Sequence, residues 1–62
     1  MKDIEDYSDE ELIEIAIDYA DENLDFDDDF VRSLEKKLDL YNHLTVGQRK
    51  ALENVVISFE MI

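Results

Sequence analysis

The sequence predicts an all-α protein, a compact three-helix bundle in a single acidic domain that spans residues 1–62. The chain has no proline and one glycine, so it lacks the turn residues of a small β fold. Two capping-box patterns mark helix starts, and apolar residues recur every three or four positions, as on one face of a helix. We expect helices over residues 9–23, 28–41 and 46–60, with residues 1–7 loose.

The first helix begins after Ser8, in the sequence Ser-Asp-Glu-Glu. The Ser8 hydroxyl can accept a backbone N–H one turn into the helix, and Glu11 can reach back to the Ser8 N–H. The expected apolar stripe consists of Ile13, Ala16, Ile17, Ala20 and Leu24, widened by Leu12, Ile15 and Tyr19. The remaining surface has no Lys or Arg and carries Asp9, Glu10, Glu11, Glu14, Asp18, Asp21 and Glu22.

The second helix follows a short aspartate run. Asp27 or Asp28 can cap it, and the neighbouring aspartates favour the positive end of its dipole. If Asp27 is the cap, Phe26 is placed to pack against Val31 as a hydrophobic staple. The expected apolar stripe is Phe30, Val31, Leu34, Leu38 and Tyr41.

The third helix begins at a second capping box, formed by Thr45 and Gln48, after Asn42 and His43 end the preceding helix. Its expected inward residues are Ala51, Leu52, Val55, Val56 and Phe59, with Met61 and Ile62 frayed or docked at the end. We expect the apolar stripe of the first helix to cover the hairpin formed by the other two helices.

Composition limits the class of protein. With no cysteine, neither a disulfide framework nor a thiolate metal site can support the small core. The uncharged runs are far shorter than the roughly 18 apolar residues that span a bilayer, and the N-terminus lacks the basic-then-apolar order of a secretory signal. We therefore expect a soluble, cytoplasmic protein that does not bind membranes.

Charge is distributed very unevenly along the chain. The first 29 residues carry 14 carboxylates and one lysine, whereas the remaining 33 carry four carboxylates and five Lys or Arg, and the net charge is −12. Acidic neighbours four apart on the first helix lie about 6 Å from one another, and each pair costs about 0.7 kcal/mol in water. Once the residues at helix starts are set aside, the row that remains is Glu14, Asp18, Asp21 and Glu22. Together with Glu10 it forms the expected anionic partner-binding face.

This acidic row has two interpretations. It is either a solvated face that keeps the protein soluble, or an anionic platform that binds a basic protein surface, with carboxylates in place of DNA phosphates. The second interpretation favours a DNA- or RNA-processing or defence protein as the partner. Direct binding to nucleic acid is disfavoured, because the chain has only six basic residues in a negative field.

An apolar association surface is the alternative hypothesis. Tyr19, Phe26 and Tyr41 are candidate apolar anchors, together with Met61, because aromatic residues dominate binding hot spots. Phe30 and Phe59 are expected to serve as core or staple residues instead. Such a surface would join the chain to a copy of itself or to a larger enzyme.

Metal and catalytic sites are not expected. Asp25, Asp27 and Asp29 begin like a calcium-binding EF-hand loop, but Phe30 stands at the glycine position and Lys36 at the position of the bidentate glutamate. The single histidine, His43, has no cysteine to pair with, and one glycine cannot form a phosphate-binding loop. We expect no enzyme activity, no metal and no cofactor.

One stretch resembles a known group of proteins. Residues 30–52, FVRSLEKKLDLYNHLTVGQRKAL, are similar to a helix-loop-helix module of small phage proteins and phage-encoded DNA enzymes, in the short family associated with the phage T4 recombination helicase UvsW and its small companion protein. The residues that carry the resemblance are Phe30, Ser33, Leu34, Leu44, Thr45, Gln48, Ala51 and Leu52. It covers about a third of the chain and implies a phage or mobile-element origin, in a setting of DNA recombination, replication or evasion of host defence. No helicase motif is present, so no ATPase activity is implied.

Overall fold

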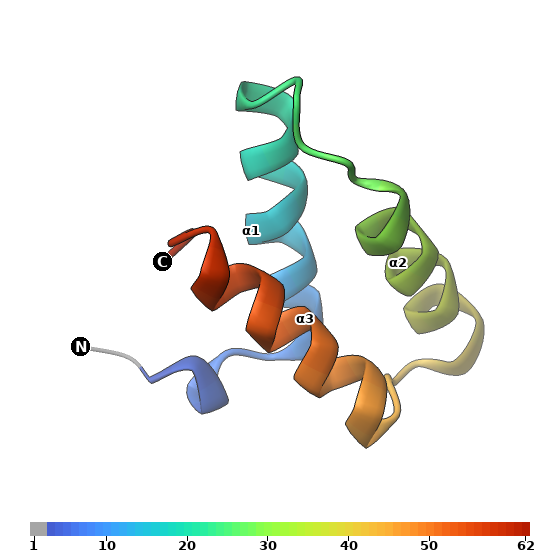
Figure 1. The fold of residues 1–62 in the computed structure, drawn as a ribbon. Helices are drawn as coiled ribbons and strands as arrows, with labels where there is room; N and C mark the ends of the chain where they lie inside the picture. The colour runs from blue at the N-terminus through green and yellow to red at the C-terminus, as the bar shows by residue number, and fades with distance from the viewer. Residues whose placement is uncertain (1–2) are drawn as a thin grey trace.

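The computed structural model describes residues 3–62. A short 3-10 helix, η1 (Ile4–Asp6), precedes three α-helices, α1 (Asp9–Glu22), α2 (Asp29–Tyr41) and α3 (Val46–Ser58). No strand occurs among the described residues, so the predicted all-α three-helix bundle is confirmed (Figure 1). None of the helices in residues 3–62 has the length and apolar character needed to cross a membrane.

Both predicted capping boxes are present. The Ser8 hydroxyl accepts the Glu11 N–H at 3.1 Å, and the Ser8 N–H donates to Glu11 Oε1 at 2.9 Å. The Thr45 hydroxyl and the Gln48 side chain make the same two bonds, also at 3.1 and 2.9 Å. Because each box depends on residues three apart, the sequence alone was enough to place the starts of α1 and α3.

The start of α2 differs from a simple side-chain cap. Asp28 occupies the cap position, but its side chain accepts no backbone N–H of the helix, while Asp27 Oδ1 accepts the Asp29 N–H at 3.1 Å. Since Asp27 is not the cap, the condition for the predicted staple of Phe26 on Val31 is not met.

The first two helices end at asparagines. The Asn23 side-chain amide donates to the Tyr19 carbonyl oxygen at 2.9 Å and closes α1 one residue before the predicted end. Leu24 therefore lies beyond the helix and is 93% exposed, so its predicted place in the apolar stripe is wrong. Asn42 ends α2 with a φ of 62°, in the left-handed region that asparagine tolerates better than most residues.

The end of α3 is a Schellman motif rather than two further helical residues. The Glu60 N–H donates to the Ile57 carbonyl at 3.1 Å, and the Met61 N–H donates to the Val56 carbonyl at 2.9 Å. Glu60 has a φ of 52°, which suits glycine and is unfavourable for glutamate. The predicted helix over residues 46–60 therefore stops at residue 58.

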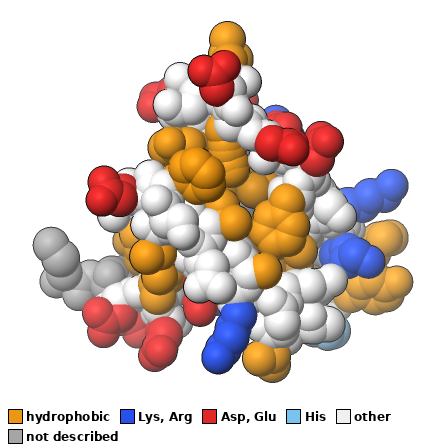
Figure 2. Space-filling model, in the orientation of Figure 1, with side chains coloured by type: hydrophobic (Ala, Val, Ile, Leu, Met, Phe, Trp, Pro, Cys, Tyr) orange, Lys and Arg blue, Asp and Glu red, His pale blue; other side chains and the backbone are white. Residues whose placement is uncertain are grey.

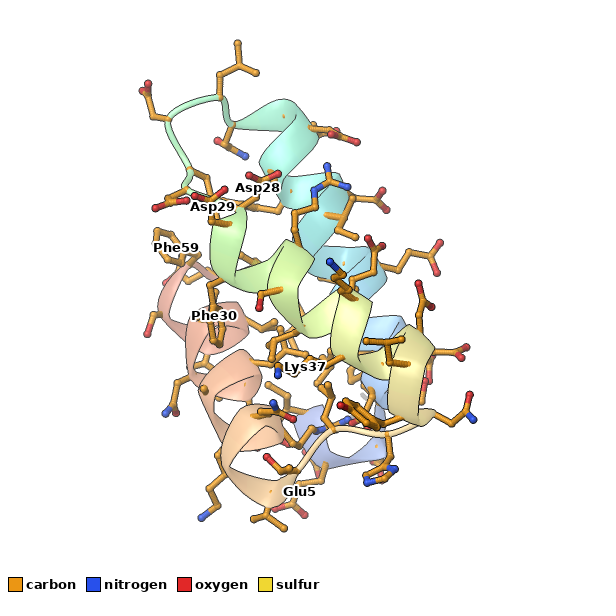
Figure 3. All side chains as sticks on the ribbon, turned by 90° about the vertical axis from the view of Figure 1, so that its right-hand side faces the viewer. Glu5, Asp28, Asp29, Phe30, Lys37 and Phe59 are labelled. Atoms are coloured by element: carbon orange, nitrogen blue, oxygen red, sulfur yellow. The ribbon has the colours of Figure 1, made fainter. Side chains whose placement is uncertain are left out.

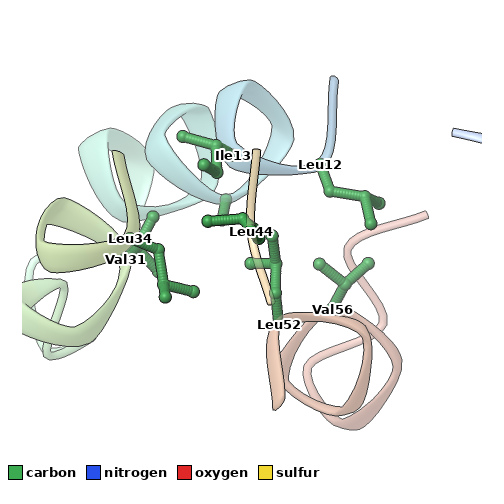
Figure 4. Close-up of a cluster of buried hydrophobic side chains, with 8 residues drawn as sticks. Leu12, Ile13, Val31, Leu34, Leu44, Leu52 and Val56 are labelled. Carbon is green, nitrogen blue, oxygen red and sulfur yellow. The ribbon is translucent and has the colours of Figure 1, made fainter. Parts of the chain in front are cut away.

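The core lies where α1 meets both other helices. Helix α1 packs against α2 and against α3, whereas α2 and α3 contact each other much less. The first helix therefore covers the other two as expected, but α2 and α3 pack on each other much less than the expected hairpin would (Figure 1). The buried side chains of the core cluster are Leu12, Ile13, Ala16, Val31, Leu34, Leu44, Leu52 and Val56 (Figure 4).

Three aromatic residues predicted on apolar stripes are not buried. Tyr41 is 61% exposed, Phe59 is 49% exposed and Phe30 is 40% exposed. Phe30 and Phe59 were expected in core or staple positions, so that prediction is wrong. In Figure 3 Phe30 projects from α2 toward α3, and Phe59 lies at the end of α3. Because α2 and α3 diverge, their facing side chains have little opposite them to complete their burial.

The N-terminal segment differs from the expected loose chain. Residues 4–6 form η1, and Ile4 and Tyr7 are half-buried against the core. The Asp6 side chain accepts the Asp3 N–H at 3.2 Å, which completes a capping box of its own. Residues 1 and 2, which the same prediction covered, lie outside the described residues.

Candidate functional site

Five carboxylates form a continuous surface on α1, which we call the anionic face. All of its members are exposed, and they are Glu10, Glu14, Asp18, Asp21 and Glu22. At 100° per residue they occupy an arc of about 120° around the helix. In Figure 3 oxygen-tipped side chains project outward along α1. The structure thus brings together all five residues predicted for this site.

The anionic face has almost no basic neighbour. Within residues 3–62, none of its five carboxylates forms an ion pair with Lys or Arg. Arg32 on α2 interacts with one member of the face at longer range. Its pKa is raised mainly by a hydrogen bond to Asp28, and the charges of Glu35 and then Asp21 add smaller contributions. The Arg32 Nε lies 3.0 Å from Asp28 Oδ2, so this cation already has a partner outside the anionic face.

Other acidic residues of the N-terminal half have structural roles. Glu11 belongs to the capping box, and Asp9 pairs with Arg49 of α3. The Asp9 carboxylate also accepts the Leu44 N–H at 3.2 Å, which joins the start of α1 to the loop before α3. Asp9 and Glu11 therefore stabilise the fold, whereas the carboxylates of the anionic face form no ion pair within residues 3–62.

Arg49 is the centre of a contact set that sequence reasoning missed. Its guanidinium donates to Asp9 Oδ1 at 2.7 Å, to Glu53 Oε2 at 2.9 Å and to the carbonyl oxygens of Ile4 and Tyr7. The side chain is only 19% exposed. Burial by itself lowers the pKa of Arg49, but the hydrogen bonds to Glu53 and Asp9 outweigh it, so the pKa is raised. We call this set the Arg49 clasp.

A signal for the clasp did exist in the sequence. Arg49 precedes Leu52 by three residues and Val56 by seven, so it lies on the buried stripe of α3. An arginine at such a position usually has a carboxylate or carbonyl partner, because a buried charge without one is costly. The partner, Asp9, is 40 residues away along the chain, so no local sequence pattern could identify it.

The predicted apolar anchors fall into two places. Tyr19 and Phe26 lie together, with ring centroids 5.4 Å apart, and Phe59 completes the cluster at 5.9 and 5.0 Å from them. Figure 2 shows hydrophobic side chains gathered in the middle of the face that is turned to the viewer. Tyr41 lies apart from them, in a shallow hollow that it shares with His43 near the α2–α3 loop.

A groove between α1 and α2 was not anticipated. It has a volume of about 370 Å³ and is open to solvent. Ile13, Ile17 and Leu38 line its floor, so it is apolar at the bottom. Two carboxylates from each helix complete the lining, namely Glu10 and Glu14 of α1 with Glu35 and Asp39 of α2. One edge of the anionic face therefore forms the wall of an apolar groove.

The aspartate run before α2 has helix-start roles. Carboxylate oxygens of Asp27, Asp28 and Asp29 lie within 4.8 Å of one another, close enough to share a cation. Asp25, which the EF-hand comparison included, is not part of this group. Since Asp28 pairs with Arg32 and Asp27 accepts a backbone N–H, two of the three carboxylates are already engaged.

Comparison of the chain with family models, with curated proteins and with solved structures found no match. The resemblance of residues 30–52 to the phage helix-loop-helix module therefore stays a prediction.

Proposed function

We propose that this chain is a non-enzymatic acidic binding protein whose anionic face binds a basic surface of a DNA- or RNA-processing or defence protein. In this proposal the carboxylates occupy the places of DNA phosphates. The observation that carries it is the arc of about 120° formed by five exposed carboxylates, none of which pairs with a Lys or Arg of residues 3–62. A row of this kind repels itself, at about 0.7 kcal/mol per neighbouring pair in water, and a cationic partner relieves that cost.

The setting we propose is that of a phage-type accessory or inhibitor protein in the host cytoplasm. The resemblance of residues 30–52 supports this origin, and the charge of −12 supports a basic partner. A protein that mimics DNA needs no metal or cofactor, since electrostatic complementarity and shape are enough to occupy a DNA-binding surface.

The proposal is tested with a three-amide variant, Glu14→Gln with Asp18→Asn and Asp21→Asn. Immobilised wild type and variant are incubated with bacterial lysate across a salt gradient, and the retained proteins are identified by mass spectrometry. We expect the wild type to retain a DNA-binding protein that duplex DNA displaces, and the variant to bind it at least about tenfold more weakly.

A matched control removes three carboxylates outside the anionic face. The variant Glu5→Gln, Asp25→Asn, Glu60→Gln changes the net charge equally, and all three positions are exposed. It should bind nearly as well as the wild type. Equal affinity of the three-amide variant and the wild type would refute the proposal.

A second candidate function rests on the exposed aromatic cluster. Tyr19, Phe26 and Phe59 form an apolar surface on which Phe59 is half exposed, and a small accessory subunit could associate through it with a copy of itself or with a larger phage enzyme. Salt would strengthen this association and weaken one based on the anionic face. Measuring the mass in solution at low and high salt separates the two candidates.

A further inference from the structure

The groove between α1 and α2 has two chemically distinct parts. Its floor consists of Ile13, which is 4% exposed, and the half-buried Ile17 and Leu38. Its volume of about 370 Å³ lies near the lower end of the range of about 300–1,000 Å³ for ligand pockets. An open apolar groove of this size accommodates a few side chains of a larger partner better than it encloses a small molecule.

The walls of the groove carry charge of one sign. Glu10 and Glu14 stand on the α1 side, with Glu35 and Asp39 on the α2 side. None of the four forms an ion pair with a Lys or Arg in residues 3–62, and no basic residue lines the groove in that part of the chain. The lining is therefore complementary to a partner that presents apolar and basic groups together.

The spacing of the carboxylates favours a helical partner. On each wall the two carboxylates are four residues apart, one helical turn or about 6 Å. A helix lying in the groove can place apolar side chains on the floor at i and i+4, and Lys or Arg side chains against both walls. Long basic side chains also cover apolar surface with their stems, which suits a groove whose floor and walls differ in polarity.

We propose that this groove binds a basic amphipathic helical segment of the partner protein. The inference rests on the proposed function and deepens it, because it names the element that the anionic protein recognises. It adds two α2 residues, Glu35 and Asp39, to the binding surface, and makes an apolar contact part of the recognition. The other edge of the anionic face, at Asp21 and Glu22, then contributes only long-range attraction.

The test uses the full chain, labelled with ¹⁵N and in its methyl groups, and a synthetic amphipathic helical peptide of Leu and Lys. A peptide of the same composition, scrambled to remove the helical periodicity, is the control probe. We expect NMR shift changes at Ile13, Ile17 and Leu38 with the first peptide, and much weaker binding of the second. Shift changes centred on the aromatic cluster, or equal affinity for both peptides, would overturn the inference.

Charge-matched variants test the α2 wall. Glu35→Gln with Asp39→Asn should weaken binding of the amphipathic peptide about five- to tenfold, whereas Asp21→Asn with Glu22→Gln should weaken it about twofold. Equal losses would show that only net charge matters, which overturns the groove inference and leaves the proposed function standing. A loss confined to the Asp21 and Glu22 variant would also overturn it. The lysate experiment with the three-amide variant tests the proposed function separately, because two of its three substitutions, at Asp18 and Asp21, lie outside the groove lining.

The floor of the groove has its own control. Ile17→Thr introduces a hydroxyl into the groove, and Ile57→Thr makes the same change at a position on α3 that is 56% exposed. We expect only the first to weaken peptide binding, by about fivefold. If a variant is less folded by circular dichroism, the NMR map of the wild type still decides the question.

Discussion

Replacing Arg49 with methionine should remove a large share of the stability of this protein. The guanidinium donates to two carboxylates and two backbone carbonyls, three of them within residues 4–9 and one on α3, and the side chain is only 19% exposed. Hydrogen bonds to charged groups contribute about 1.5–3 kcal/mol each, and their loss here is partly offset by water at the edge of the clasp. We expect a loss of about 2–4 kcal/mol, against a total of about 3–9 kcal/mol for a domain of this length.

Thermal and urea unfolding, followed by circular dichroism at the helix band, measure this loss. The midpoint of thermal unfolding should fall by at least about 8 °C, since each kcal/mol shifts it by about 4–8 °C in a domain of this size. Hydrogen exchange of residues 3–7 should increase as well, because the Ile4 and Tyr7 carbonyls lose their donor.

Lys50→Met is the matched control, since it removes the same charge from the exposed neighbouring position on α3. It should change the stability by no more than about 0.5 kcal/mol. Arg49→Lys should fall between the two, because an ammonium group cannot reach four acceptors that surround a planar guanidinium. The reasoning is refuted if the Arg49→Met protein is as stable as the Lys50→Met protein.

The pH dependence of the clasp follows from the raised pKa of Arg49. A basic group whose pKa is raised by folding contributes stability that is fully present below the ordinary pKa and is lost as the pH rises through the folded-state value. For arginine this loss occurs only in strong alkali. The stability difference between wild type and Arg49→Met should therefore be constant from about pH 6 to about pH 9.

The remaining predictions concern helix ends and the anionic face. Glu60→Gly should stabilise the protein by about 1 kcal/mol, because glycine suits the left-handed C′ position of the Schellman motif, whereas Glu60→Gln, which removes only the charge, should change little in urea unfolding. Ser8→Ala should cost about 1 kcal/mol through the loss of the α1 cap, and an unchanged urea midpoint would contradict the role of the capping box. The three-amide variant should be slightly more stable than the wild type at low salt, with the difference disappearing at about 1 M salt, where charges are screened within about 3 Å. A variant less stable than the wild type at low salt would contradict the repulsion argument.

Local patterns explain what could be predicted about the helices. The pairs Ser8–Glu11 and Thr45–Gln48 lie within one turn, so their hydrogen bonds depend on the sequence between them and on little else. The ends were less predictable, because a residue with positive φ ends a helix whether or not it is glycine. Glu60 adopts this conformation although glutamate does not favour it, since Met61 and Val56 then make their hydrogen bond.

Burial was predicted well where helices meet and poorly where they diverge. Leu12, Val31, Leu52 and Val56 are fully buried, as helical periodicity indicates. Periodicity also placed Phe59 inward, but its burial depends on whether another helix lies opposite. Phe59 packs against Tyr19 and Phe26, at the end of α3, and stays half exposed.

The candidate site also has one part that the sequence predicts and one part that it does not. The arc from Glu10 to Glu22 follows from helix geometry once α1 is known, so the sequence was sufficient to place it. The groove needs Glu35 and Asp39 beside Glu10 and Glu14, and only the packing of α2 on α1 brings those pairs together.

By itself, the sequence determined three helices, two of their starts and one anionic face, because each depends on interactions within a few residues. The tertiary structure decided the roles of the individual carboxylates. Asp9 lies at the start of the same acidic helix as Glu10, yet it binds Arg49 from 40 residues away, while Glu10 stays free at the edge of a groove. The physical reason is that a charge acquires its partner through packing of distant segments, which no local spacing encodes.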